Sequence, residues 1–239
     1  MKLKNEIRST IYALLIAILI RSIIFEPFSI PSGSMKPNYL VGDYLFVSKY
    51  YYGISRYSFP FWPNIFSGRV WELHKPKRGD VIVFRQPSDP SIHYIKRLIG
   101  LPGDRIQLID GYVYLNGKKL EQKQISDFVD QEPYPHETIK RLVETIDDNT
   151  SYEILDYTPF GDADNTDVFE VPEGKYFFMG DNRDNSHDSR KINGKIGFVP
   201  EEFIIGRAEF VLFSNPESLF KIWEWVFSFN KDRFFLKAK

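Results

Sequence analysis

The chain has 239 residues, enough for one substantial domain together with an anchor or a small second lobe. Its 31 Lys and Arg side chains nearly balance its 32 Asp and Glu side chains, so the chain lacks the positive charge typical of nucleic-acid-binding proteins, and we expect no nucleic-acid partner. The sequence contains no cysteine, which excludes disulfides, thiolate metal sites and a cysteine nucleophile.

The first predicted element is an apolar helix. Basic residues within 1–10 precede an apolar stretch over 11–25, in which Arg21 is the single charged residue. This length predicts a transmembrane helix that serves as an anchor, with the basic N-terminus in the cytosol and everything after Phe25 outside. A cleaved signal peptide is the alternative, but the following segment lacks the small-x-small pattern of a cleavage site, which favours an uncleaved anchor.

From Asp43 onward, short runs rich in Val, Ile, Tyr and Phe are separated by Gly, Pro and Asp, a pattern typical of β-structure. We therefore predict a mainly β exterior domain of antiparallel sheets, formed by 26–120 and 171–213 around an inserted lobe. Asn116 and Gly117 both tolerate positive φ and predict a hairpin turn. The predicted strands are Asp43–Ser48, Asp80–Phe84, Ile92–Ile99, Arg105–Ile109, Tyr112–Leu115, Lys175–Met179 and Arg207–Phe213.

Two stretches look like insertions. Tyr50–Trp71 is crowded with aromatic residues, Pro and Gly, and predicts either contact with lipid or a packed surface loop. The acidic stretch 121–170 predicts a lobe peripheral to the chemistry, with a helix at Glu137–Ile146 and a strand at Ser151–Tyr157. The C-terminal segment 214–239 carries apolar residues at helical spacing and a basic tail, and predicts an interfacial helix, with a terminal helix packed on the β-domain as the alternative.

A candidate nucleophile, Ser34, lies in the segment Ile30–Pro37, shortly after the apolar stretch. Even a fully extended chain places it within roughly 30 Å of Phe25, and so near a bilayer surface. Serines in such turns commonly have no catalytic role, so the hypothesis depends on a base. His187, flanked by two aspartates, would allow a serine-histidine-aspartate arrangement. The other histidines have no metal-ligand spacing, so we expect neither a metal nor a cofactor.

Lysine is the other candidate base, but it must be neutral at the working pH and therefore needs an apolar pocket. If Ile92–Ile99 is a strand, Lys96 shares a face with Tyr94 and Leu98, which would supply such surroundings. A lysine that only extends from a strand edge is the alternative. The charged loop Asp181–Arg190 lacks a calcium-binding pattern, and we interpret it as a hydrogen-bonded loop that orients the lysine.

Four blocks of the sequence, in this order, are Arg21–Met35, Arg78–Phe84, Tyr94–Asp104 and Gly180–Arg190. Together they resemble the bacterial type I signal peptidases, which are membrane-bound serine-lysine endopeptidases. The resemblance covers the candidate serine, the candidate lysine and the charged loop, and leaves the two insertions largely unmatched.

The resemblance implies a role for each matched residue. Ser34 would be the nucleophile and Lys96 the general base, while Ser32 would donate its hydroxyl to the oxyanion hole together with the Ser34 backbone N–H. Ser186 would hydrogen-bond and orient Lys96. The loop would be held by Asp181, Asp188 and Arg190. Shallow pockets for the side chains one and three residues before the cut would be lined by Phe28, Ile30, Met35, Val83 and Ile95.

By this resemblance the protein cleaves N-terminal signal peptides from exported preproteins after small residues at −3 and −1. It would do so at the exterior face of the bacterial cytoplasmic membrane, in contact with the lipid bilayer and close to the translocation machinery. One alternative is a penicillin-binding type of acyl transferase, whose Ser-x-x-Lys pattern recurs at Ser218–Lys221 and Ser228–Lys231 without its companion motifs. Another is a non-catalytic membrane-anchored scaffold, which the presence of Ser34 and Lys96 disfavours.

Overall fold

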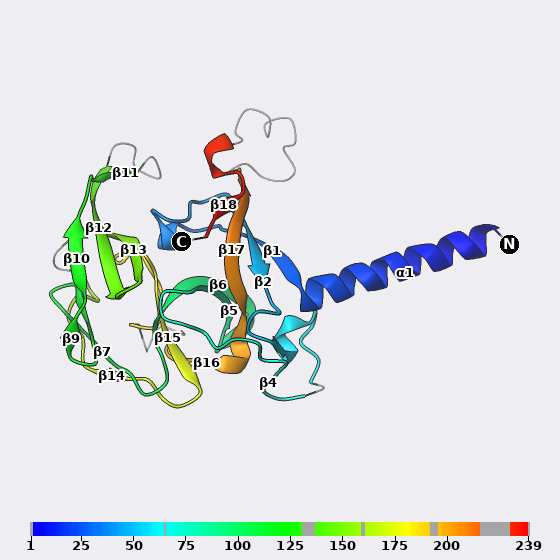
Figure 1. Cartoon of the computed structure of the whole chain (residues 1–239), viewed down its shortest axis with the longest axis horizontal. Coiled ribbons are helices and arrows are strands. Elements are labelled where there is room, and N and C mark those ends of the chain that lie inside the picture. Colours follow the sequence, from blue (N-terminus) through cyan, green and yellow to red (C-terminus); the bar gives the residue numbers. More distant parts are fainter. Residues whose placement is uncertain are drawn as a thin grey trace.

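The computed structural model describes residues 2–64, 66–130, 137–158, 161–191, 196–215 and 230–238. Over these ranges the chain forms one long helix, α1 (Lys2–Ile23), followed by antiparallel strands. Figure 1 shows α1 projecting away from a β-rich body. The predicted mainly β architecture is confirmed.

The largest sheet contains the strands that position the site. These are β1 (Phe25–Ser29), β2 (Asp43–Ser48), β5 (Val81–Gln86), β6 (Asp89–Gly100), β15 (Lys175–Met179), β16 (Val199–Pro200), β17 (Ile204–Ser214) and β18 (Leu236–Lys237). Their order is β1-β2-β17-β5-β6-β15-β16, with β18 paired to β17, and the neighbours are antiparallel. The sheet therefore brings the start of the chain next to strands from its middle and its end.

Three smaller sheets complete the body. Their strands are β3 (Ile54–Ser55), β4 (Arg69–Val70), β7 (Arg105–Ile109), β8 (Tyr112–Leu115), β9 (Lys118–Lys119), β10 (Glu121–Gln124), β11 (Phe128–Asp130), β12 (Glu137–Asp147), β13 (Thr150–Asp156) and β14 (Phe169–Glu170). The orders are β3-β4, β14-β7-β8-β9 and β10-β12-β11, with β13 paired to β12. Between β8 and β9, Asn116 and Gly117 have φ of 53° and 80°, which confirms the predicted hairpin turn.

The predicted helix at Glu137–Ile146 is wrong, because this segment is strand β12. It pairs with β10, β11 and β13, and its side chains alternate, with Leu142, Glu144 and Ile146 buried. A period of two is the signature of a strand, and the buried glutamate within it concealed that period in the sequence. The neighbouring strand predicted at Ser151–Tyr157 is confirmed as β13.

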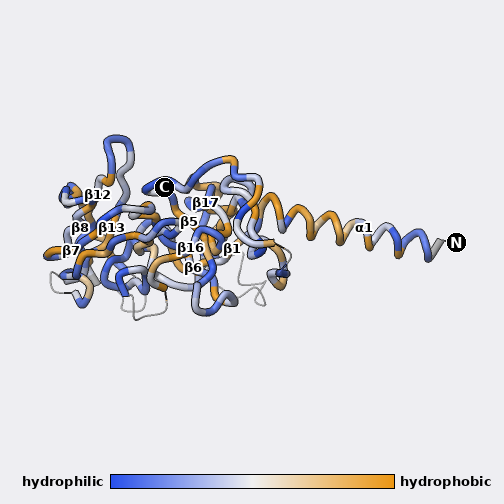
Figure 2. Tube along the Cα trace, turned by 90° about the horizontal axis from the view of Figure 1, so that it is seen from below, coloured by the Kyte–Doolittle hydropathy of each residue, from blue (hydrophilic) through white to orange (hydrophobic). Residues whose placement is uncertain are grey.

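The helix α1 departs from the predicted anchor over 11–25. It begins at Lys2 and ends at Ile23, and its apolar side chains, such as Leu14 and Leu19, are exposed. Figure 2 shows the hydrophobic middle of the helix standing clear of the body. Among the described residues, no helix combines the length and the apolar character that crossing a membrane requires. The expected transmembrane helix is therefore not found.

The predicted interfacial helix of 214–239 lies mostly outside the described residues, which omit 216–229. The described part after this gap contains a single turn at Lys231–Arg233 and then β18, which adds to the edge of the main sheet beside β17. The end of the chain thus packs on the β-domain.

A cluster of buried apolar side chains supports one face of the main sheet at the segment that carries Ser34. Its members include Ile30, Met35, Leu45 and Val83, each at most 2% exposed. Burial of such side chains stabilises the fold by about 1.5 to 3 kcal/mol each relative to full exposure. The turn that follows β1 is therefore built on a well-packed base.

Candidate active site

Ser34 lies in a single 3-10 turn, Gly33–Met35, shortly after β1. The Lys36 N–H donates to the Gly33 carbonyl at 3.1 Å, and Pro37 then prevents the turn from continuing as a helix. The Ser34 side chain is buried, with the residue only 8% exposed. The sequence Ser-Gly-Ser-Met thus presents one hydroxyl from a short, fixed turn.

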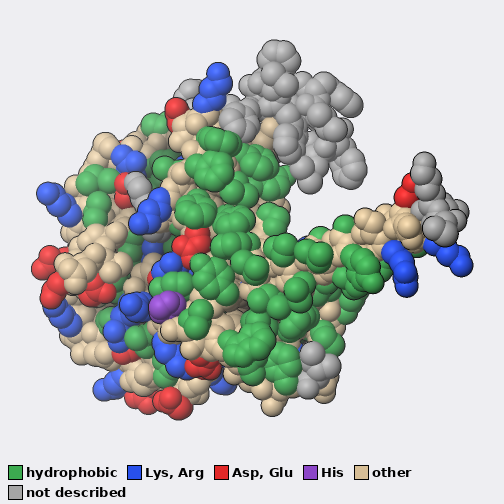
Figure 3. Space-filling view, turned by 45° about the vertical axis from the view of Figure 1, so that its right-hand side comes forward, with side chains coloured by type: hydrophobic (Ala, Val, Ile, Leu, Met, Phe, Trp, Pro, Cys, Tyr) green, Lys and Arg blue, Asp and Glu red, His purple; other side chains and the backbone are tan. Residues whose placement is uncertain are grey.

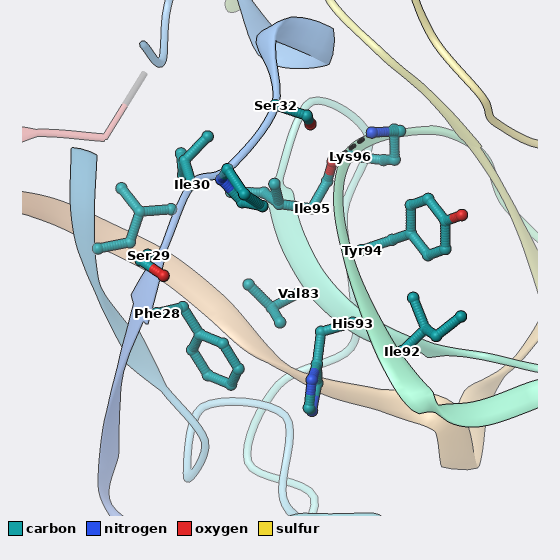
Figure 4. Close-up of a pocket in the computed structure, with 12 residues that line it drawn as sticks. Phe28, Ser29, Ile30, Ser32, Val83, Ile92, His93, Tyr94, Ile95 and Lys96 are labelled. Atoms are coloured by element: carbon teal, nitrogen blue, oxygen red, sulfur yellow. Dashed lines mark hydrogen bonds between the residues drawn. The ribbon is translucent and has the colours of Figure 1, made fainter. Parts of the chain in front are cut away.

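Lys96 on β6 reaches the Ser34 hydroxyl across the sheet. Its Nζ lies 2.6 Å from Ser34 Oγ. The same Nζ donates to the Ile95 carbonyl at 2.9 Å (Figure 4). The β5–β6 register pairs Lys96 with Ile82, and the side chain of Lys96 is fully enclosed. The expected apolar and aromatic surroundings are present, with the Tyr94 ring centroid 5.5 Å from Nζ.

The environment of Lys96 favours its neutral form. Burial lowers the pKa of Lys96 to about 8, although the negative charges of Asp188 and Asp181 act in the opposite direction. A lysine with an ordinary pKa is protonated at neutral pH and cannot accept a proton, whereas one near 8 is neutral in a useful fraction of molecules. The site therefore contains a serine hydroxyl hydrogen-bonded to an amine that can act as a base.

Ser32 lies beside the nucleophile candidate. Its Oγ is 3.4 Å from Ser34 Oγ, at the limit of a hydrogen bond. Both hydroxyls therefore belong to the same small site, and Figure 4 shows the Ser32 side chain near that of Lys96.

The charged loop after β15 is held by two buried ion pairs. Arg97, adjacent to Lys96 in β6, donates to both carboxylate oxygens of Asp181 at 2.7 Å. Arg190 binds Asp188 at 2.9 Å, and Asp188 also accepts the Gly180 N–H. Burial would raise the pKa of Asp188, but these donors hold it below its usual value. One of these pairs lies within the loop and the other joins the loop to β6.

Two residues of the loop, Ser186 and His187, were candidates for a role beside Ser34 and Lys96. Ser186 is buried next to Gly180, where an added Cβ would lie 2.2 Å from Ser186 Oγ, but its hydroxyl forms no hydrogen bond with Lys96 among the described residues. His187 is exposed, whereas Ser34 is buried and bonded to Lys96. The geometry thus favours lysine over histidine as the base.

A cavity of about 250 Å³ opens beside Ser32 and Lys96 (Figure 4). Its walls include four of the five predicted pocket residues, namely Phe28, Ile30, Val83 and Ile95. Met35 does not line it, because its side chain is completely buried in the core beneath the turn. The cavity is additionally lined by His93, which the sequence did not single out, and the His93 ring meets the Phe28 ring edge-on at 5.3 Å.

The inserted lobe contacts the charged loop directly. Arg183 forms a buried ion pair with Glu144 of β12, with Nη to Oε distances of 2.8 and 2.5 Å. The backbone of Leu155 in β13 exchanges hydrogen bonds with Asp181 and Arg183. Two strands of the lobe therefore fix the position of the loop that faces Lys96.

Asn182 connects this loop to the nucleophile turn, a role that the sequence did not reveal. Its backbone N–H donates to the Ser34 carbonyl at 3.1 Å, and its side-chain amide donates to the Gly33 carbonyl at 3.0 Å. These contacts join positions 148 and 149 residues apart, so no local pattern could have found them.

Across the described ranges, His, Asp and Glu side chains form no group of three or more that could hold a metal ion.

Comparison with known proteins places this site in a family. A family profile described as "Signal peptidase, peptidase S26" matches residues 3–213. This chain belongs to the peptidase S26 family of signal peptidases. Its sequence is 47% identical over 220 residues to Signal peptidase I of Rickettsia massiliae, covering 89% of this chain and 80% of the relative. The corresponding protein of Rickettsia canadensis is 48% identical over 219 residues, covering 88% and 80%.

A solved signal peptidase I from Enterococcus faecalis V583 superposes weakly, with a TM-score of 0.33 at 29% identity over 57% of this chain and 98% of that one. The assignment therefore depends on the sequence matches, which identify the protein as a serine endopeptidase of signal peptide processing. They decide against both alternatives considered from the sequence, the penicillin-binding type of acyl transferase and the non-catalytic scaffold.

Proposed function

We propose that the enzyme cleaves signal peptides with a Ser34–Lys96 catalytic dyad. The observation that carries this proposal is the 2.6 Å contact between Ser34 Oγ and a buried Lys96 Nζ whose pKa is lowered to about 8. Neutral Lys96 accepts the Ser34 proton while Ser34 Oγ bonds to the carbonyl carbon at the cleavage site. The protonated lysine then donates to the departing amine of the mature protein, and the acyl group remains on Ser34.

Hydrolysis of the acyl-enzyme uses the same groups in reverse. Neutral Lys96 takes a proton from water, the hydroxide attacks the ester carbon, and the proton returns to Ser34 Oγ as the signal peptide leaves. In both steps the carbonyl oxygen gains negative charge. Ser32 Oγ and the Ser34 backbone N–H are the proposed donors to this oxyanion, and such donors contribute about 2.7 to 4 kcal/mol each in enzymes of this type. Ser186, near Asp188, is proposed to orient Lys96 during turnover.

The cavity beside the dyad suits small side chains. A space of about 250 Å³ lined by Phe28, Ile30, Val83 and Ile95 supports selection of small residues at −3 and −1. Its apolar walls stabilise methyl groups by burial, and larger side chains would meet these walls. Alanine at both positions is the expected preferred substrate.

We further propose that the enzyme acts at the exterior face of the bacterial cytoplasmic membrane, attached through exposed apolar surface. Figure 3 shows hydrophobic side chains gathered on a face of the body that continues onto α1. On the body, Phe61, Trp71 and Leu73 are 91%, 72% and 63% exposed. Exposed aromatic and aliphatic groups of this kind partition into the lipid interface. Close contact with the translocation machinery would follow from this location.

Cleavage of a preprotein with an Ala-x-Ala site tests the proposed chemistry. Purified wild-type enzyme should release the signal peptide, whereas Ser34→Ala and Lys96→Ala should abolish release and His187→Ala should retain most of it. A folded His187→Ala enzyme without activity would transfer the role of base to histidine.

Vesicle flotation tests the proposed attachment. The full chain should float with phospholipid vesicles, and the variants Leu14→Lys/Leu19→Lys and Phe61→Ser/Trp71→Ser should each float less. A wild-type chain that stays at the bottom of the gradient would contradict attachment, and protection of the domain from protease added to spheroplasts would contradict the exterior location.

A further inference from the structure

Lys36 lies two residues after the nucleophile candidate, and its side chain is buried rather than solvated. Its Nζ binds both carboxylate oxygens of Asp130, at 2.7 and 2.9 Å, and both residues are under 10% exposed. Asp130 is the last residue of β11, 94 positions further along the chain. This buried ion pair therefore ties the lobe to the turn that carries Ser34. It is separate from the Arg183–Glu144 pair, which ties the lobe to the charged loop.

The stem of Lys36 covers the backbone of Gly33. A Cβ added to Gly33 would lie 3.2 Å from Lys36 Cε, 3.3 Å from Cδ and 3.7 Å from Nζ. The side chain thus folds back over the residue between Ser32 and Ser34, and Asp130 fixes its far end. Because a stem of this length has many rotamers, the ion pair is needed to keep it in this one conformation.

The orientation of the Gly33–Ser34 peptide decides where the Ser34 N–H points. The Gly33 carbonyl accepts from the Lys36 N–H at 3.1 Å and from the Asn182 side chain at 3.0 Å. In a planar trans peptide the carbonyl and the following N–H point in opposite directions, so whatever holds the Gly33 oxygen also aims the Ser34 N–H. That N–H is one of the two proposed oxyanion donors.

We propose that Lys36 and Asp130 form a positioning pair that holds the Gly33–Ser34 peptide in the orientation required for oxyanion stabilisation, an inference that rests on the proposed role of Ser34. Neither side chain touches the reacting atoms. The pair acts through Gly33, by packing the Lys36 stem on it and by holding the segment from which the Lys36 N–H donates. Loss of the pair lets the peptide rotate, and the donor geometry is lost even though Ser34 and Lys96 are intact.

The test compares Lys36→Met and Asp130→Asn with a matched control, Lys49→Met. Methionine is similar to lysine in length and removes the charge. Lys49 forms a comparably buried ion pair, with Glu26 at 2.6 Å and side chains 3% and 14% exposed, against 9% and 8% for Lys36 and Asp130. The control therefore reproduces the loss of a buried lysine charge near the beginning of β1, whereas the Ser34 turn follows the end of that strand. Each protein is assayed at a temperature where circular dichroism shows it folded.

We expect Lys36→Met and Asp130→Asn each to lower kcat by roughly 10-fold to 100-fold, the range that misplacement by about 1 Å produces, with KM little changed. The double variant should be no worse than either single variant, because the two side chains act as one unit. The pH midpoint of kcat/KM should stay in place, since the charges that act on Lys96 are Asp188, Asp181 and Arg190. Lys49→Met should keep the wild-type kcat.

A second measurement isolates the oxyanion. A peptide aldehyde ending in alanine forms a hemiacetal in which Ser34 Oγ bonds to the aldehyde carbon and the carbonyl oxygen enters the oxyanion position, whereas the matching peptide alcohol cannot. Lys36→Met should weaken binding of the peptide aldehyde about tenfold and leave binding of the peptide alcohol unchanged.

The outcomes separate the two levels of the proposal. Wild-type enzyme without Ser34-dependent cleavage would remove the proposed function itself. Two results with an active wild-type enzyme would overturn the positioning role alone. One is a Lys36→Met variant whose kcat equals that of Lys49→Met. The other is a Lys36→Met variant that loses equal affinity for the peptide aldehyde and the peptide alcohol. If Lys36→Met does not fold, the charge-free double variant Lys36→Met/Asp130→Leu replaces it, and a wild-type kcat in that protein would overturn the role equally.

Discussion

Replacing Lys96 with methionine should produce an inactive enzyme whose stability depends on pH less steeply than that of the wild type. The pKa of Lys96 is lowered from 10.5 to about 8, mainly by burial. The difference of about 2.5 pKa units corresponds to about 3 kcal/mol, at about 1.36 kcal/mol per unit. Because the side chain is fully enclosed, solvent screening does not reduce this figure greatly.

The sign follows from counting protons in the two states. Above pH 10.5 both the folded and the unfolded chain hold a neutral Lys96, and the wild type carries no penalty. Between about 8 and 10.5 the unfolded chain binds a proton that the folded chain does not, so stability falls as the pH is lowered. Below about pH 8 both states are protonated and the penalty of about 3 kcal/mol is complete. Methionine has no proton to bind, so the variant lacks the contribution of Lys96 to the pH dependence of stability.

Urea unfolding of both proteins at pH 7 and pH 10 measures this effect. The free energy of unfolding of Lys96→Met minus that of the wild type should be larger at pH 7 than at pH 10 by about 2 to 3 kcal/mol. Other titrating groups cancel in this comparison, since both proteins contain them. A difference that does not change with pH would refute the argument and would mean that Lys96 keeps an ordinary pKa in the folded enzyme.

Three further predictions concern the groups around the dyad. Asp188 is the charge that raises the pKa of Lys96 most, so in Asp188→Asn the acid limb of the kcat/KM profile should move to lower pH. Arg190 lowers the pKa of Lys96, so in Arg190→Gln the acid limb should move to higher pH. A shift of the acid limb in the same direction in both variants would contradict this prediction. Glu144→Gln leaves Arg183 buried without its charged partner and should lower the free energy of unfolding in urea by about 3 to 5 kcal/mol. Glu170→Gln, in the exposed pair with Arg105, should lower it by less than about 1 kcal/mol. Equal losses of unfolding free energy in the two variants would refute this prediction. Cleavage should continue in EDTA, and inhibition that zinc or calcium reverses would disprove a metal-free reaction.

The strands were predictable where the sequence alternates regularly and a turn residue follows. Strands β2, β7, β8 and β15 have the predicted bounds, and the turn at Asn116 and Gly117 follows from backbone freedom alone. The strand β12 was missed because Glu144 interrupts its apolar alternation. The charge of that buried glutamate is neutralised by Arg183, 39 residues later, and a local pattern contains no information about such a partner.

The same limit applies to the site. Ser34 and Lys96 were found from motifs that resemble a family, and the structure brings them to 2.6 Å although 62 residues separate them. Met35 was expected in the pocket from the resemblance, but successive residues of a tight turn face different directions and Met35 faces the core. Lys36, Asp130 and Asn182 escaped notice because their contacts are made only when the lobe and the loop close on the turn.

The arrangement of charge around Lys96 explains how an uncharged amine can be kept within a strongly charged neighbourhood. Alternation along β6 directs Arg97 to the face opposite Lys96, where it binds Asp181. Arg190 binds Asp188 in the same way. Each aspartate that would draw a proton onto Lys96 thus has a guanidinium of its own, and what remains at the lysine is mainly the cost of burial. In the sequence, the aspartates of the loop would be expected to favour a charged Lys96, but their pairing with arginines leaves Lys96 able to be neutral.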